Sequence, residues 1–182
     1  MDIENYISSV KGAIITAEEI QNGIAEAGKY IDSLYDGRPI LLTGILNGCF
    51  MFMADLARAV NVPCEVAFMA AKSYEGTESS GSVRITLDLD RDISGYHVVI
   101  AEDIIDTGRT LKAVTELLRA REPLSLHVVT LLDKPSRRAV DFKADYTLFT
   151  IPDAFVVGYG LDYNGYYRNL PYIGEISLAN DN

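Results

Sequence analysis

Three carboxylates, two threonines and a glycine lie close together in the stretch from Glu102 to Thr110. The stretch directly follows the apolar run 98–101, so these polar groups come at the carboxyl end of an expected buried strand. Open α/β sheets bind their ligands at that edge. Neighbouring acids such as Glu102 and Asp103 can bind sugar hydroxyls, or a Mg²⁺ ion that also touches phosphate oxygens. The stretch therefore predicts a site for a phosphorylated small molecule.

Thr107, Gly108 and Thr110 stand where the strand pattern changes to a helix pattern. Free backbone N–H groups at a helix N-terminus, the helix dipole and the threonine hydroxyls all favour an anion there. Gly108 allows the backbone to approach that anion closely and to adopt a positive φ. The chain has no Walker-type phosphate loop, so the pattern favours a single phosphomonoester over a nucleoside triphosphate tail.

Asp106 lies apart from the acid pair, and its carboxylate is suited to act as a general base toward a weakly acidic N–H group. Taken alone, the fragment 106–108 also fits a helix-capping cluster on an ordinary loop between a strand and a helix. A receiver-type acidic pocket is another alternative for the same fragment. The fragment by itself leaves these alternatives open.

The composition narrows the classes of function. The chain has 182 residues, 48% of them hydrophobic, and a formal net charge of −10 without a basic cluster, which indicates one globular domain and argues against a nucleic-acid partner. The N-terminus lacks the pattern of a signal peptide, and no apolar run reaches the roughly 18 residues of a membrane span. Cys49 and Cys64 have no metal-binding spacing with each other or with a histidine, so we expect buried, reduced thiols in a cytoplasmic protein.

Hydrophobic periodicity predicts the elements that position these groups. Residues 16–19 form a capping box ahead of apolar residues at helical spacing, which predicts a helix over 16–35. The Ser/Gly/Glu-rich segment 72–82 is expected to be a long loop of the kind that usually serves function. Strands that alternate with helices predict an α/β fold with a mainly parallel central sheet flanked by helices. The other expected elements are helices at about 49–60 and 109–120, and strands at about 40–46, 64–70, 83–89, 97–101, 125–132, 146–151 and 155–159.

Residues 98–110 resemble the signature of the phosphoribosyltransferases that use phosphoribosyl pyrophosphate. The likeness runs from about Leu41 to Ile173. Over this range the chain is similar to the bacterial hypoxanthine-guanine class of the type I phosphoribosyltransferase family. It implies a single domain over residues 1–182, with a parallel-sheet core at about 38–150 and a small hood from about 1–15 and 151–182. Three further segments carry the likeness: 44–56, 131–138 and 151–163.

The resemblance implies a role for each polar residue of the signature. Asp106 would accept the proton from N7 of the purine as the glycosidic bond forms. Glu102 and Asp103 would hold the ribose hydroxyls, directly or through Mg²⁺. The 5-phosphate and its surroundings would be bound by the loop that joins the strand to the helix: Ile105, Thr107, Gly108, Arg109 and Thr110.

Pyrophosphate would be bound at a second loop, formed by Leu46, Asn47 and Gly48. The resemblance implies a cis peptide bond between Leu46 and Asn47. Some family members have Lys or Arg in place of Asn47, so backbone amides and Mg²⁺ would bind more of the anion in this chain. Asp162 would coordinate Mg²⁺ together with pyrophosphate, and Arg168 would contact the pyrophosphate too.

The purine would be recognised by residues nearer the C-terminus. Lys134 would donate to the 6-oxo group, which selects oxo-purines over adenine. Phe155 would stack on the ring, and Val156 would offer backbone groups to the base edge. Ser73 and Tyr74 match the family's lid, which would close over the site and exclude water.

The implied activity is Mg²⁺-dependent purine salvage. The enzyme would join hypoxanthine, and guanine as a second base, to phosphoribosyl pyrophosphate and release the nucleotide and pyrophosphate. The expected partners are these small molecules and further copies of the chain in a homodimer or homotetramer, with no nucleic acid and no membrane. Two alternatives remain: a regulatory ligand-binding protein that kept the fold, and the same chemistry restricted to xanthine or guanine.

Overall fold

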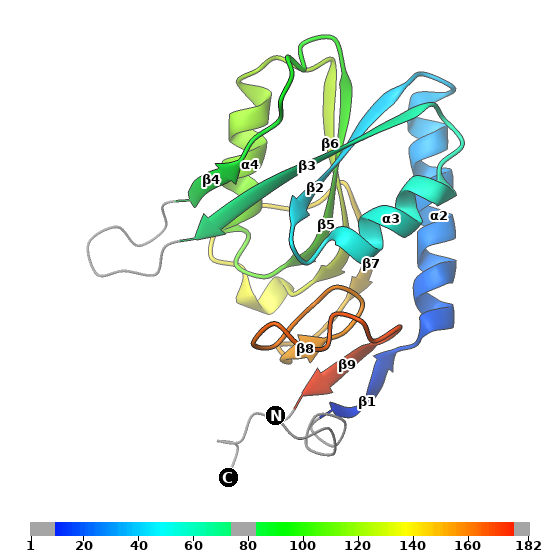
Figure 1. The fold of residues 1–182 in the computed structure, drawn as a ribbon, viewed down its shortest axis with the longest axis vertical. Helices are drawn as coiled ribbons and strands as arrows, with labels where there is room; N and C mark the ends of the chain where they lie inside the picture. The colour runs from blue at the N-terminus through cyan, green and yellow to red at the C-terminus, as the bar shows by residue number, and fades with distance from the viewer. Residues whose placement is uncertain (1–9, 74–82, 177–182) are drawn as a thin grey trace, which may run out of the picture.

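Six strands form the central sheet of the computed structural model, which describes residues 10–73 and 83–176 (Figure 1). Their order across the sheet is β4-β3-β2-β5-β6-β7, and every neighbouring pair is parallel except β3 and β4. The predicted α/β fold with a mainly parallel sheet is therefore confirmed. The strands are β2 (Ile40–Leu46), β3 (Cys64–Ser73), β4 (Val83–Leu87), β5 (His97–Ile105), β6 (Ser125–Asp133) and β7 (Tyr146–Thr150).

Helices cover both faces of this sheet. On one face, α2 (Ala17–Tyr35) and α3 (Phe50–Ala59) pack on strand residues such as Val99, and on the other face α4 (Arg109–Arg119) packs on residues such as Val98. Consecutive residues of a strand point to opposite faces, so an apolar run such as that of β5 fills both cores. No helix in the described part of the chain has the length and apolar character needed to cross a membrane.

The first helix is delimited as the capping residues predict. The Glu19 N–H donates to Thr16 Oγ1 at 3.2 Å, and the Thr16 N–H donates to the Glu19 carboxylate at 2.8 Å. Asp36 ends the helix in the left-handed conformation. The hydroxyl of Tyr35, the last helical residue, lies 2.9 Å from His127 Nδ1 in β6. The helix is thus fixed at both ends by polar contacts.

Two strands extend further than predicted. β5 continues past Ala101 to Ile105 because its pairing with β6 persists through Ile104 and Ile105, so Glu102 and Asp103 lie within the strand rather than at its end. β3 continues to Ser73, which pairs with Val83 of β4. The predicted loop over 72–82 therefore starts too early, and residues 74–82, with the candidate lid residue Tyr74, lie outside the described residues.

A second, antiparallel sheet lies at the carboxyl edge of the first (Figure 1). It consists of β1 (Val10–Ile15), β9 (Ile173–Ile176) and β8 (Val156–Val157), in that order, and we call these strands the hood. The strand predicted over 155–159 contains only the two residues of β8. Cys49 is buried as expected, whereas Cys64 is only half-buried, and both are free thiols.

The crossing of α2 and α3 yields a stability prediction. A Cβ added at Gly28 would lie 2.6 Å from the backbone oxygen of Ala59, so Gly28→Ala must push the helices apart. We expect a loss of about 1–3 kcal/mol in the free energy of unfolding, although alanine is the better helix former. Urea denaturation measures this, with Asn22→Ala on the exposed face of the same helix as control. Equal stability of the two variants would contradict the packing argument.

Candidate active site

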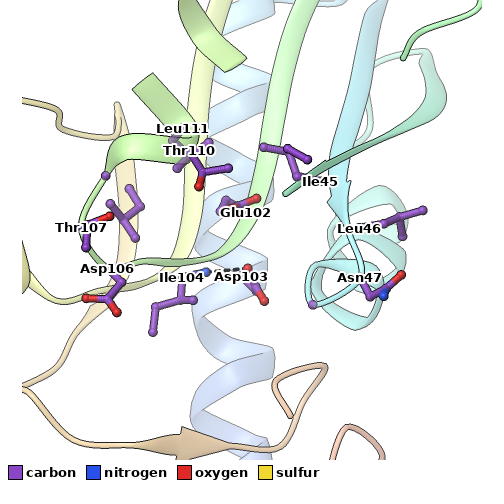
Figure 2. Close-up of a pocket in the computed structure, with 14 residues that line it drawn as sticks. Ile45, Leu46, Asn47, Glu102, Asp103, Ile104, Asp106, Thr107, Thr110 and Leu111 are labelled. Carbon is purple, nitrogen blue, oxygen red and sulfur yellow. Dashed lines mark hydrogen bonds between the residues drawn. The ribbon is translucent and has the colours of Figure 1, made fainter. Parts of the chain in front are cut away.

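A cavity of about 240 Å³ lies at the carboxyl edge of the central sheet, between the loop after β2 and the loop that joins β5 to α4 (Figure 2). Four apolar residues that were not predicted, Ile45, Ala71, Ile104 and Leu111, complete its lining. They carry no chemical signature that sequence reasoning could use. The predicted residues that line it are Leu46, Asn47, Gly48, Glu102, Asp103, Ile105, Asp106, Thr107, Gly108 and Thr110.

The two adjacent acids of β5 lie in the middle of this cavity (Figure 2). Glu102 is buried, and its Oε2 has no hydrogen-bond partner. Burial raises the pKa of the Glu102 carboxyl well above its usual range, and the charge of Asp103 raises it further. Asp103 accepts a hydrogen bond from the Ile104 N–H at 2.9 Å, yet burial raises its pKa to about 6. Both acids therefore favour a ligand that supplies positive charge or hydrogen-bond donors.

These oxygen atoms are suited to a hard cation. Mg²⁺ is commonly held by one or two carboxylates and completed by substrate phosphates and water. The buried, unpartnered oxygen of Glu102 beside Asp103 fits that arrangement. The described residues contain no group of three His, Cys, Asp or Glu side chains that could hold a metal by themselves. The third predicted ligand, Asp162, instead forms an ion pair with Arg168 at 2.6 Å.

The start of α4 lies beside the acids. Gly108 is the N-cap residue with a φ of 79° and has no side chain to cap the helix, while the Arg109 N–H donates to Thr107 Oγ1 at 3.4 Å. The positive φ favours glycine at this position, and a Cβ there would also lie 3.0 Å from Arg138 Cδ, so the arginine side chain would have to shift slightly. A helix N-terminus of this kind binds a phosphate group readily. Arg109 is exposed and lies outside the cavity lining.

The loop after β2 approaches the acids from the other side, with Asn47 opposite Asp103 (Figure 2). The peptide bond between Leu46 and Asn47 is cis, as the resemblance implies. A Cβ added at Gly48 would lie 1.6 Å from Asp103 Oδ2, and one added at Gly160 would lie 2.1 Å from the Gly48 carbonyl oxygen. Three segments thus meet at Gly48 with no space for side chains.

The residues predicted to recognise pyrophosphate from the C-terminal side do not line the cavity. Arg168 Nη1 donates to the Gly160 carbonyl oxygen at 2.5 Å, which ties it to the turn that packs on Gly48. The positive charge of Arg168 lowers the pKa of Asp103, and the negative charge of Asp162 raises it, so both side chains act electrostatically on this acid. Both effects are smaller than that of burial.

The predicted purine-binding residues also lie outside the cavity lining. Lys134 follows β6 and is buried, and its backbone N–H donates to the Ile105 carbonyl oxygen at 2.9 Å. Val156 lies in β8, and the ring of Phe155 beside it is 43% exposed. This ring packs edge-to-face on Tyr163 with 5.5 Å between centroids. Ser73 belongs to the end of β3 rather than to a loop.

Asp106 lies on the side of the opening nearest Thr107 (Figure 2). Its side chain is 41% exposed, and its Oδ1 accepts a hydrogen bond from Arg137 Nε at 3.1 Å. Arg137 belongs to the 3₁₀ turn η1 (Pro135–Arg137). Sequence reasoning assigned no role to this arginine, although it lies in segment 131–138, which carries part of the family resemblance. Only the tertiary contact distinguishes it from an ordinary surface arginine.

The raised pKa of Asp103 predicts a pH effect on stability. Between the ordinary value of 3.8 and the native value of about 6, the native state binds more protons than the unfolded state, so Asp103 destabilises the metal-free protein increasingly as pH rises. Relative to wild type, Asp103→Asn should gain on the order of 1 kcal/mol between pH 5 and pH 7.

Urea unfolding in metal-free buffer at the two pH values measures the difference. Asp90→Asn is the matched control because the side chain of Asp90 is 82% exposed. A difference between Asp103→Asn and wild type that stays constant or reverses with pH would contradict the argument.

The comparisons with known proteins agree with this geometry. The phosphoribosyl transferase domain family matches residues 13–164. The hypoxanthine phosphoribosyltransferase of Salmonella typhimurium is 52% identical over 171 residues, which span 92% of this chain and 96% of the relative. The hypoxanthine-guanine phosphoribosyltransferase of Staphylococcus aureus is 49% identical over 170 residues, which span 93% and 95%.

A solved structure gives the same result for the fold. The crystal structure of a hypoxanthine phosphoribosyltransferase from Staphylococcus aureus superposes with a TM-score of 0.90 at 47% identity and covers 94% of each chain. The family match covers most of the chain, and the relatives are similar over nearly their whole length. The chain therefore belongs to the phosphoribosyltransferase family.

Proposed function

We propose that this chain is a purine-salvage enzyme that transfers the phosphoribosyl group of phosphoribosyl pyrophosphate to hypoxanthine, and to guanine as a second base. The observation that carries the proposal is the cavity in which the N-terminus of α4 lies beside buried Glu102 and half-buried Asp103. Relatives about half identical to this chain are named for transfer to these two bases.

The two sides of the cavity bind different parts of phosphoribosyl pyrophosphate. The N–H groups that follow Gly108 and the hydroxyls of Thr107 and Thr110 bind the 5-phosphate. Glu102 and Asp103 accept hydrogen bonds from the ribose hydroxyls, which supplies the donor that Glu102 Oε2 lacks. The loop over 46–48 binds the pyrophosphate with its backbone amides. This placement aligns the anomeric carbon for displacement.

Asp106 acts on the incoming base. As the bond from N9 of the purine to the anomeric carbon forms, the bond from that carbon to pyrophosphate breaks and its electron pair leaves with the pyrophosphate. The purine then carries an extra proton, which the Asp106 carboxylate accepts from N7. Phe155 stacks on the ring, Val156 offers backbone groups to its edge, and the Lys134 ammonium donates to the 6-oxo group.

A bound Mg²⁺ ion would be held by Glu102, Asp103 and substrate oxygens, and it would stabilise the negative charge of the leaving pyrophosphate. In this arrangement Asp162 and Arg168 complete the pyrophosphate side from the segment between β8 and β9. We further propose that the enzyme works in the cytoplasm and that it assembles as a homodimer or homotetramer.

Base selectivity tests the proposed reaction. With phosphoribosyl pyrophosphate and Mg²⁺ supplied, hypoxanthine and guanine should turn over, and adenine should not, because its 6-amino group is a donor facing the Lys134 donor. A spectrophotometric assay that presents hypoxanthine, guanine, xanthine and adenine separately measures this. No turnover of any base by the folded protein would favour a regulatory ligand-binding protein instead.

The role of Asp106 is tested by Asp106→Asn, which keeps the shape of the side chain and removes its basicity. We expect kcat to fall roughly 10²–10⁴-fold. The free energy of unfolding should change little because the carboxylate is half-exposed. Steady-state kinetics and urea unfolding measure the two quantities, and Asp90→Asn serves as control. Turnover equal to wild type would remove Asp106 from the mechanism.

A further inference from the structure

Arg137 joins two acids that belong to different parts of the candidate active site. Its Nε donates to Asp106 Oδ1 at 3.1 Å, and its Nη1 lies 3.7 Å from Asp153 Oδ2. Asp106 follows β5, whereas Asp153 lies two residues before Phe155, the candidate stacking residue. A single guanidinium therefore links the proposed base to the segment that carries the proposed purine platform.

The two residues after Arg137 bind the backbone of the loop that contains Asp106. Arg138 donates through Nη1 to the Asp106 carbonyl oxygen and through Nη2 to the Asp133 carboxylate. The Ala139 N–H donates to the Thr107 carbonyl oxygen at 3.0 Å. Arg138 and Ala139 thus hold the backbone at Asp106 and Thr107 in place. The rotamer of the Asp106 side chain is not fixed by these contacts, and Arg137 is the residue that contacts its carboxylate.

Control of that direction matters because the Asp106 side chain is 41% exposed and has no surrounding core to fix its rotamer. A general base must lie within hydrogen-bond distance of the proton that it accepts. Arg137 Nε donates to Oδ1 of this carboxylate, so Oδ2 is the oxygen assigned to the purine proton. A planar guanidinium orients a carboxylate better than an ammonium does. The guanidinium of Arg137 is directed at two carboxylates, those of Asp106 and Asp153, so its contacts favour an action through Asp106.

We propose that Arg137 is a positioning residue that orients the Asp106 carboxylate for proton transfer and couples this orientation to the purine-binding segment through Asp153. The proposal rests on the proposed function, in which Asp106 is the general base. An exposed ion pair contributes little to folding, so the effect of Arg137 should appear in turnover rather than in stability.

The test combines Arg137→Gln with Asp106→Asn. In the wild-type background, Arg137→Gln should lower kcat roughly tenfold while the KM for phosphoribosyl pyrophosphate stays unchanged, because misdirection of a catalytic group slows the chemical step without affecting the phosphate contacts. In the Asp106→Asn background the same change should lower kcat less than twofold, since no base remains to be oriented.

Two further variants make the result specific. Arg137→Lys keeps the charge but loses the planar group, and it should give a kcat between those of wild type and Arg137→Gln. Arg119→Gln changes an exposed arginine at the far end of α4 and should match wild type. Urea unfolding of every variant shows which kcat values refer to folded protein, and Arg137→Lys decides the question if Arg137→Gln does not fold.

Each contrary outcome has a distinct meaning. A kcat for Arg137→Gln equal to that of Arg119→Gln overturns the positioning role and leaves the proposed function intact. An equal loss in both backgrounds, or a raised KM for phosphoribosyl pyrophosphate, means that Arg137 acts on the phosphates and also overturns it. Absence of turnover in the wild-type protein overturns the proposed function itself and the inference with it.

Discussion

The withdrawal of two adjacent acids from solvent at the carboxyl edge of the sheet, where Glu102 is buried and Asp103 half-buried, is the constraint on which this structure depends. Glu102 and Asp103 lie within β5, flanked by β2 and β6, and Glu102 Oε2 has no donor. An ionised carboxylate without a partner is costly in such surroundings, which explains why burial raises both pKa values. The free protein bears this cost, and a ligand that brings hydroxyls or a cation relieves it. Part of the free energy of ligand binding therefore comes from supplying partners to polar groups that have none in the free protein.

The surrounding backbone packs closely against the acid pair on the side of the loop that follows β2. Gly48 lies against Asp103, and Gly160 lies against Gly48, each too close for a Cβ atom. This contact joins the loop after β2 to the segment between β8 and β9 at the point where pyrophosphate is proposed to bind. On the other side of the acids, Thr107 and Thr110 line the cavity near the start of α4 (Figure 2). Shape and charge consequently favour a molecule with an anionic group at one end and hydroxyls next to it.

Sequence reasoning succeeded where local chemistry decides the structure. The capping box at Thr16 and the apolar run of β2 gave correct bounds for these elements, and the polar stretch after Ala101 correctly marked the cavity. It failed where the structure is decided by contacts between residues that are far apart in the sequence. The acids of β5 resembled a strand end, but pairing with β6 continues past them to Ile105. The hood strands β1 and β9 are short, and they pair with each other although most of the chain lies between them. The contact between Arg137 and Asp106 likewise joins residues 31 positions apart. No local pattern records such contacts.

The connection between the hood and α2 has a mechanical consequence. Thr16 alone separates β1 from this helix, which is about 28 Å long at 1.5 Å per residue and reaches the opposite edge of the sheet, where Tyr35 contacts His127. On its other side, the hood joins the core through the irregular residues 151–155, between β7 and β8. Val156 of β8 and Ile173 of β9 also belong to the buried apolar cluster that contains residues of α2 and α3. The hood is therefore joined to the core by this packing as well as by its two chain connections, and a change in its position would disturb the packing of α2.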